Sequence, residues 1–156
     1  KLLSQLDNQA ADLFHRLCSI TISQTYGEDV YDARVVSLNG NPAQNSLNNY
    51  GLGFDELNIL SEYGLIISDY NSYMGYGSQR ANTNLVSQPI KYNNEYYGLF
   101  KTDQTNHKDL RLSGVTFTKS GKELLGIVDI TPNDYYTADL ITYFKSRKLK
   151  FELLPK

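Results

Sequence analysis

Apolar and polar positions alternate along the chain with two periods, one helical and one typical of strands. The segment SQLDNQAADLFHRLCSITI carries apolar residues three and four positions apart, at Leu6, Ala10, Leu13, Phe14 and Leu17. This spacing places them on one face of a helix. The pattern predicts a helix over residues 7–19, capped by a side-chain oxygen of Asp7 or Ser4.

The next segments predict a strand, a loop and a second helix. EDVYDARVVSL is rich in β-branched residues and predicts a strand, and NGNPAQNSLNNYG predicts a turn-rich loop. Phe54, Leu57 and Leu60 share one helical face and predict a helix over residues 54–63. Gly64 suits the left-handed position that follows a helix.

The middle of the chain predicts β structure interrupted by a long loop. Residues 65–67 are β-prone, whereas residues 71–88 are rich in Asn, Ser and Gly and predict a mobile loop. The segment IKYNNEYYGLFK predicts a β-hairpin, because Asn93 and Asn94 accept the positive φ of a tight turn.

The C-terminal segments predict two strands and two helices. DLRLSGVTFT predicts a strand whose apolar phase changes at Ser113 and Gly114, as at a β-bulge. KSGKELLGIV predicts a short helix, and LKFELL predicts a half-buried strand. Between them, Thr131 as cap, Pro132 at the first helical position and Asp134 in the first turn predict another helix start.

Length and composition favour one globular domain of the α+β class over residues 1–156. The chain has 156 residues, of which 40% are hydrophobic and 21% charged, as is usual for a soluble domain. It begins with Lys1 and its only methionine is Met74, so we expect it to be the C-terminal part of a longer protein. With the single cysteine Cys18 no intramolecular disulfide can form, and we expect a reducing, cytoplasmic location without membrane contact.

Charge divides the chain into an acidic and a basic half. Residues 1–78 hold three basic and nine acidic side chains, and residues 79–156 hold twelve basic and eight acidic ones. This asymmetry is typical of an acidic or phosphate-bearing partner, or of two solvated faces that differ by chance. The candidate nucleic-acid contacts are Lys91, Lys101, Arg111, Lys119 and Lys122.

Tyrosine is the most unusual component, with thirteen tyrosines and no tryptophan. Tyrosine offers contact area at low entropy cost and suits partner surfaces, but it is also a common strand residue. The candidate partner contacts, in the predicted loop and hairpin, are Tyr70, Tyr73, Tyr76, Tyr92, Tyr96 and Tyr97.

The stretch TFTKSGKE does not match a phosphate-binding loop. Six residues separate Gly114 from Gly121 where such a loop has four, and Glu123 stands at its Ser/Thr position. The stretch instead predicts a strand-to-helix junction in which Thr118 caps the helix by accepting from the Gly121 amide.

Metal and catalytic sites have little support in the sequence. His15 and Cys18 stand three apart on the first helix, but there is no second His or Cys pair. A nucleophilic arrangement of Cys18, His107 and Asp109 lacks the flanking turn that would form an oxyanion site. We therefore expect no enzyme, no cofactor and no small-molecule substrate.

Two fragments carry a resemblance to known families. LNILSEYGLI, followed by β segments and FTKSGKELL, resembles the winged-helix pattern. Together with LFHRLCSI, these fragments resemble the C-terminal domain of an uncharacterised bacterial family of unknown function. The resemblance implies a winged-helix-like α+β fold with an antiparallel hairpin or small sheet and a C-terminal helix and strand, and it implies no activity.

The sequence therefore favours a non-catalytic protein-interaction or regulatory module of a larger protein, binding a protein partner or another copy of itself. Nucleic-acid binding through the basic half is the alternative. The helix expected in the winged-helix recognition position carries Asp55, Glu56 and Glu62 and no basic residue, which opposes contact with phosphates.

Overall fold

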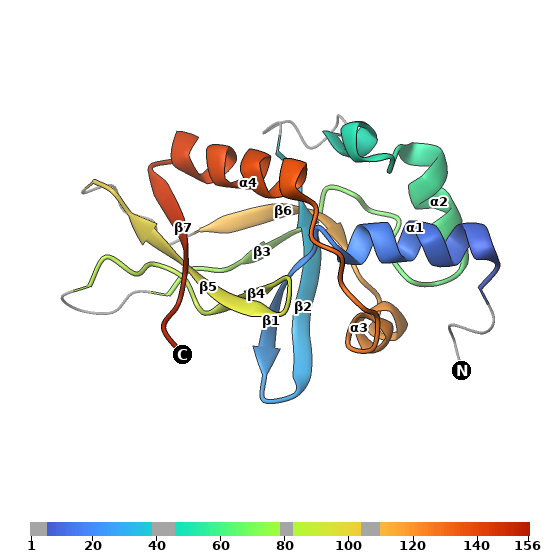
Figure 1. Cartoon of the computed structure of the whole chain (residues 1–156), viewed down its shortest axis with the longest axis horizontal. Helices are drawn as coiled ribbons and strands as arrows, with labels where there is room; N and C mark the ends of the chain where they lie inside the picture. Colours follow the sequence, from blue (N-terminus) through green and yellow to red (C-terminus); the bar gives the residue numbers. More distant parts are fainter. Residues whose placement is uncertain (1–5, 39–45, 79–82, 104–109) are drawn as a thin grey trace.

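The computed structural model describes residues 6–38, 46–78, 83–103 and 110–156, which fold around one antiparallel sheet (Figure 1). The helices are α1 (Asn8–Cys18), α2 (Phe54–Glu62), α3 (Lys119–Leu125) and α4 (Asp134–Ser146), with a 3-10 helix, η2 (Ser46–Tyr50). The strands are β1 (Ile22–Tyr26), β2 (Asp29–Val36), β3 (Tyr73–Gly75), β4 (Ile90–Tyr92), β5 (Glu95–Lys101), β6 (Arg111–Thr116) and β7 (Leu149–Leu153).

The sheet has seven strands in the order β3-β6-β2-β1-β4-β5-β7, so the α+β prediction is confirmed and the sheet is larger than the predicted hairpin. It is also curled. Beyond β3, the Gln88 amide donates to the Tyr76 carbonyl, and the Val86 amide donates to the Leu99 carbonyl. Residues 85–88 thus join the end of β3 to β5.

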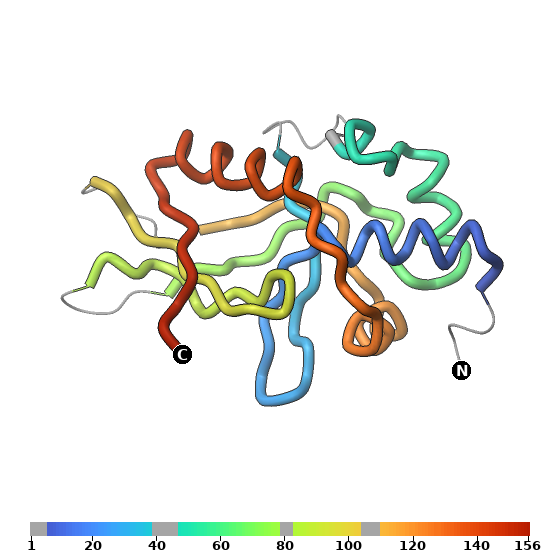
Figure 2. The backbone as a smooth tube through the Cα atoms, in the orientation of Figure 1, coloured from blue at the N-terminus to red at the C-terminus, as the bar shows by residue number. Residues whose placement is uncertain are grey.

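Helices cover both faces of the sheet. The cross-strand register places Phe151, Tyr92 and Arg34 on one face, where α4 packs with the Phe144 ring 5.4 Å from the Phe151 ring. Phe117 lies on the other face, 5.7 Å from Phe14 of α1. Helices α1 and α2 lie side by side over this second face (Figures 1 and 2).

An ion pair lies inside the curled sheet. Arg34 is 2% exposed and donates twice to Asp32, at 2.8 and 3.0 Å. It also donates to the carbonyls of Ser72 and Leu112, and the Tyr76 hydroxyl donates to Asp32 at 2.6 Å. Because each charge is paired and hydrogen-bonded, this network ties β2 to β6 and to the chain around β3.

The predicted first helix is confirmed within one residue at each end, since it was expected over 7–19 and α1 spans Asn8–Cys18. Asp7 caps it by accepting from the Ala10 amide at 2.7 Å. Residues 22–26 then form β1, a strand that the sequence pattern did not predict. The Thr21 hydroxyl donates to the Leu17 carbonyl at 2.6 Å. This bond gives a partner to one of the carbonyls in the last turn, which have none within the helix.

Two predicted turns are confirmed by backbone angles. Asn93 and Asn94 have φ values of 51° and 65° between β4 and β5, and Gly64 has a φ of 74° just past α2. The β-prone residues 65–67 contribute a single bridge, between Ile66 and Phe117.

The two fragments that carried the family resemblance are in contact. The Thr118 hydroxyl accepts from the Gly121 amide at 3.1 Å, which confirms the predicted cap, and donates to the Gly64 carbonyl at 2.5 Å. A Cβ on Gly121 would lie 2.1 Å from the Leu65 carbonyl oxygen. Glycine at this position therefore lets α3 approach the end of α2 closely.

Three local predictions need correction. β3 lies in the stretch predicted as a loop, because its three residues gain a partner only from distant β6. No register shift occurs at Ser113 or Gly114, where β6 instead passes from pairing with β3 to pairing with β2. The cap of α4 is Asn133, which accepts from the Tyr136 amide at 3.0 Å, so Thr131 and Pro132 precede the helix.

Candidate interaction surface

Two of the six candidate tyrosines lie in the core. Tyr76 is 0% and Tyr92 1% exposed, and the Tyr92 hydroxyl lies 2.6 Å from the Thr137 hydroxyl. Burial raises the pKa of both phenols above the ordinary value. Their side chains therefore offer no surface to a partner.

Tyr70 and Tyr97 are half-buried and stack on other rings. The Tyr70 ring centroid lies 6.1 Å from that of Phe54, and its hydroxyl donates to Asn58. The Tyr97 centroid lies 4.5 Å from that of Phe151. Desolvation raises the pKa of both phenols, so these rings serve mainly to pack the domain.

Tyr73 and Tyr96 are the exposed members of the predicted set, and they lie on different strands. The Tyr73 ring on β3 carries the Arg111 guanidinium 5.0 Å from its centroid. Tyr96 on β5 pairs across strands with Lys91, and its hydroxyl lies 3.3 Å from that of Thr25.

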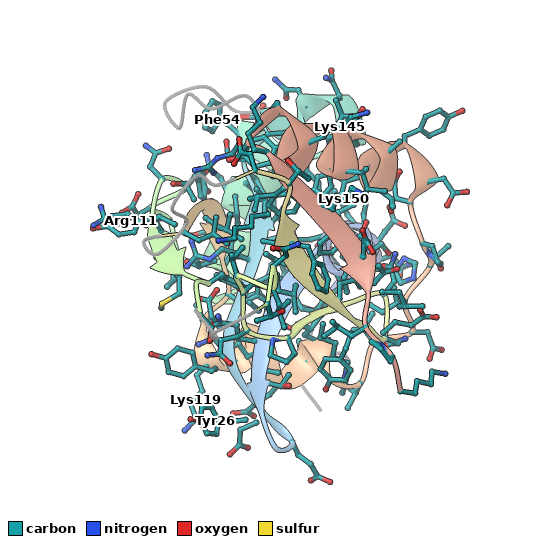
Figure 3. All side chains as sticks on the ribbon, turned by 90° about the vertical axis from the view of Figure 1, so that its left-hand side faces the viewer. Tyr26, Phe54, Arg111, Lys119, Lys145 and Lys150 are labelled. Carbon is teal, nitrogen blue, oxygen red and sulfur yellow. The ribbon has the colours of Figure 1, made fainter. Side chains whose placement is uncertain are left out.

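The β1–β2 hairpin carries two further exposed tyrosines, and the hydroxyl of its Thr25 contacts that of Tyr96. Its turn, with Gly27 at φ 62°, extends beyond the rest of the sheet (Figures 1 and 3). Tyr26 at the tip is 83% exposed and Tyr31 is 59% exposed. We call Tyr26, Tyr31 and Tyr96 the hairpin surface. Sequence reasoning missed the first two, although the Tyr-Gly pair before EDVY signals a turn.

A β-bulge sets the position of Tyr31. Gln24 pairs with Asp32 but Thr25 pairs with Val30, so Tyr31 is the extra residue of the bulge. The Lys122 ammonium group on α3 donates to the Tyr31 carbonyl at 3.1 Å. Bulges redirect side chains, and this one is held by a contact from a separate helix.

Acidic side chains lie at the tip of the hairpin, and two lysines lie nearer its base, where Lys91 pairs with Tyr96 and Lys122 contacts Tyr31. Glu28 and Asp29 are exposed at the turn, where Asp29 pairs across strands with Tyr26. Glu95 is exposed and directly precedes Tyr96 on β5. The tip of the hairpin is thus aromatic and acidic.

A small pocket of about 40 Å³ lies near the base of the hairpin, between the strands and the end of α3. Lys91, Asn93, Cys18 and Val30 are among its lining residues. The Asn93 Oδ1 atom is buried and has no hydrogen-bond partner among the described residues. Burial raises the pKa of the Cys18 thiol, so this group is neutral and poorly nucleophilic.

The five candidate basic residues do not form one groove. Lys91 and Lys122 lie beside the hairpin, whereas Lys101 pairs with Leu149 at the far end of β5. Arg111 stacks on Tyr73, and Lys119 is the first residue of α3. Figure 3 shows Arg111 and Lys119 well apart on the molecule.

The candidate catalytic and metal residues are not assembled in the part of the chain that the structure describes. The His15 Nε2 atom lies 3.2 Å from the Thr131 hydroxyl, beside a shallow groove of about 440 Å³ between α1 and the start of α4. Cys18 is 2% exposed, and His107 and Asp109 lie outside the described residues. Across residues 6–38, 46–78, 83–103 and 110–156, no group of three or more His, Cys, Asp or Glu side chains could hold a metal ion.

The fold defines a mixed α+β domain built on a curled antiparallel sheet. A family model described as "Protein of unknown function (DUF2806)" matches residues 1–141, and the chain belongs to this family. No curated protein and no solved structure matches the chain. Among the described helices, none combines the length and apolar character needed to cross a membrane.

Proposed function

We propose that this domain is a non-catalytic protein-binding module and that the hairpin surface contacts its partner. The observation that carries this proposal is the exposure of three tyrosines on or beside one projecting hairpin, where Tyr26, Tyr31 and Tyr96 are 83%, 59% and 42% exposed. Tyrosine is enriched at protein interfaces because its ring gives apolar contact while its hydroxyl stays hydrated.

The local geometry supports a preformed contact surface. The bulge at Tyr31 is held by Lys122, and Tyr96 is held by the hydroxyl of Thr25. Backbone and side chains that are held in place before binding lose less conformational entropy when the complex forms.

Charge favours a partner with basic side chains. The exposed carboxylates of Glu28 and Asp29 lie beside Tyr26 at the tip and suit lysine and arginine side chains, which also stack on tyrosine. The same carboxylates repel phosphates, so the winged-helix-type nucleic-acid alternative has less support at this surface. Action in the bacterial cytoplasm as part of a larger protein stays a prediction.

Site-specific photo-crosslinking in the source cells tests the proposal. p-Benzoylphenylalanine replaces Tyr26 in one variant and Tyr135 in the other, a matched control with 82% exposure on α4. We expect a discrete cross-linked protein from position 26 and not from position 135. The product is expected to fall several-fold when Tyr31→Ser and Tyr96→Ser are added, because such rings are frequent hot spots.

Equal products from both positions, or none from position 26, would contradict the proposal. Circular dichroism of the purified variants checks that each one folds. Identification of the cross-linked protein then shows whether its contact region is basic.

A further inference from the structure

Strand β7 ends the sheet, and its outer edge is unpaired among the described strands. It pairs with β5 only, from Tyr97–Leu153 to Lys101–Leu149. Figure 1 shows β7 running from the end of α4 towards the C-terminus. An unpaired edge is a template for another strand.

The hydrogen bonds to β5 fix which backbone groups point outward. The Leu154 amide donates to the Tyr96 carbonyl at 2.8 Å, and the Thr102 amide donates to the Lys148 carbonyl at 3.1 Å. In an antiparallel pair, alternate residues bond to the same neighbour. Even-numbered residues of β7 therefore face β5, and the peptide groups of Leu149, Phe151 and Leu153 face outward.

We propose that two copies of this chain associate by antiparallel pairing of β7 with β7, with the two-fold axis at Phe151. In this register Phe151 lies opposite Phe151 of the second copy, and Leu149 lies opposite Leu153 of the second copy. The outward peptide groups of both copies then form about six hydrogen bonds. The pairing also covers Leu153, which is 54% exposed.

The charges on β7 are self-complementary in this register. Lys150 and Glu152 are both exposed, and each lies opposite the other in the second copy. These are non-hydrogen-bonded positions, where side chains approach most closely and opposite charges attract. An edge lysine usually deters strand addition, so the Lys-x-Glu spacing favours a partner strand with the same pattern.

The charge pattern in this register favours β7 of a second copy as the strand that pairs with this edge. Shifting either strand by two residues places Lys150 opposite Lys150 or Glu152 opposite Glu152, and like charges at such positions repel. The interface is small, so we expect a reversible dimer with a Kd in about the micromolar range.

Sedimentation equilibrium of the full chain and of charge variants tests the proposal. Lys150→Glu and Glu152→Lys each replace two attractive cross-strand pairs by two repulsive ones. We expect each variant alone to dimerise at least about tenfold more weakly. Lys145→Glu, an exposed cation on α4 outside β7, is the matched control and should dimerise like the wild type.

Mixing the two single variants restores both attractive pairs, so a heterodimer is expected with an affinity near that of the wild type. The double variant Lys150→Glu, Glu152→Lys should likewise recover the homodimer. Recovery of this kind cannot arise from misfolding of either single variant.

A backbone test is independent of charge. Leu153→Pro removes an outward-facing amide and leaves the hydrogen bonds to β5 intact, so we expect a folded monomer. A wild-type chain that stays monomeric up to about 1 mM overturns the proposal. Charge variants that dimerise as well as the wild type, or a Leu153→Pro dimer of unchanged affinity, also overturn it.

Discussion

The two ends of strand β2 use the same chemical groups in opposite ways. At the C-terminal end, Asp32 and Arg34 are 5% and 2% exposed, and Tyr76 covers them with its hydroxyl on the carboxylate. At the N-terminal end, Asp29 is exposed and lies beside Tyr26, whose ring is 83% exposed. The bulge at Tyr31 separates the two ends.

The difference follows from solvation. A buried carboxylate is stable only when charge and hydrogen bonds replace the water it has lost, and Arg34 with Tyr76 supplies them for Asp32. At the tip water solvates Asp29, so its charge and the neighbouring ring are available to another molecule. One end of β2 therefore supports the fold, and the other suits recognition.

The largest effect is expected when the buried end is broken. Arg34→Met leaves the Asp32 carboxylate without its cation and removes the bonds to the carbonyls of Ser72 and Leu112. We expect a loss of about 3–5 kcal/mol in the free energy of unfolding, measured by urea denaturation. Arg16→Met, which breaks the exposed pair with Asp12 and the exposed bond to the Gly51 carbonyl, should cost less than about 1 kcal/mol. Equal losses in both variants would show that burial does not decide the strength of these pairs.

An intermediate effect is expected where α3 supports the bulge. Gly121→Ala places a methyl group 2.1 Å from the Leu65 carbonyl oxygen, so α3 must move and carry Lys122 away from the Tyr31 carbonyl. We expect a loss of about 2–3 kcal/mol and a new backbone NMR shift at Tyr31. At Gly75 nothing lies within 4 Å of an added Cβ, so Gly75→Ala is the control. A stable Gly121→Ala protein with an unchanged Tyr31 signal would contradict the role of α3.

Local elements could be predicted from the sequence because their signals are local. The cap at Asp7, the Asn93–Asn94 turn and the Thr118 cap each depend on residues within a few positions, and the structure confirms them. β1 was missed because the Tyr-Gly pair at its end was not read as the turn of a hairpin with β2. β3 was missed because so short a strand acquires its identity from a distant partner. The pairing of Tyr73 with Ser113 spans forty positions of the chain, and no local pattern records it.

The candidate surface was harder to predict than the fold. Tyrosine content identified the residue type, but only the curl of the sheet decides that Tyr76 is buried and that Tyr96 is exposed. The position of Tyr31 depends on the bulge, which is a register shift between β1 and β2. The sequence predicted only β2 of these two strands. Exposure is a property of tertiary packing, and for these residues it required the structure.

The smallest effect is expected when a single tyrosine hydroxyl is removed, either at the buried ion pair or at the exposed tip of the hairpin. Tyr76→Phe removes the hydrogen bond to Asp32 while Arg34 stays in place, so we expect a loss of about 1–2 kcal/mol at pH 7. Tyr26→Phe, at the exposed tip, should change stability by less than about 0.5 kcal/mol.

The pH dependence sharpens this last comparison. Burial, followed by the nearby Asp32 charge, raises the pKa of Tyr76 well above 10.0. Above about pH 10 the unfolded chain has lost the Tyr76 proton while the folded protein keeps it, so stability falls as pH rises. Tyr76→Phe removes this contribution, and its stability should decline less steeply than that of the wild type, by up to about 1.4 kcal/mol per pH unit. Parallel stability curves for the two proteins between about pH 9 and 11 would mean that the phenol is not held protonated by its burial.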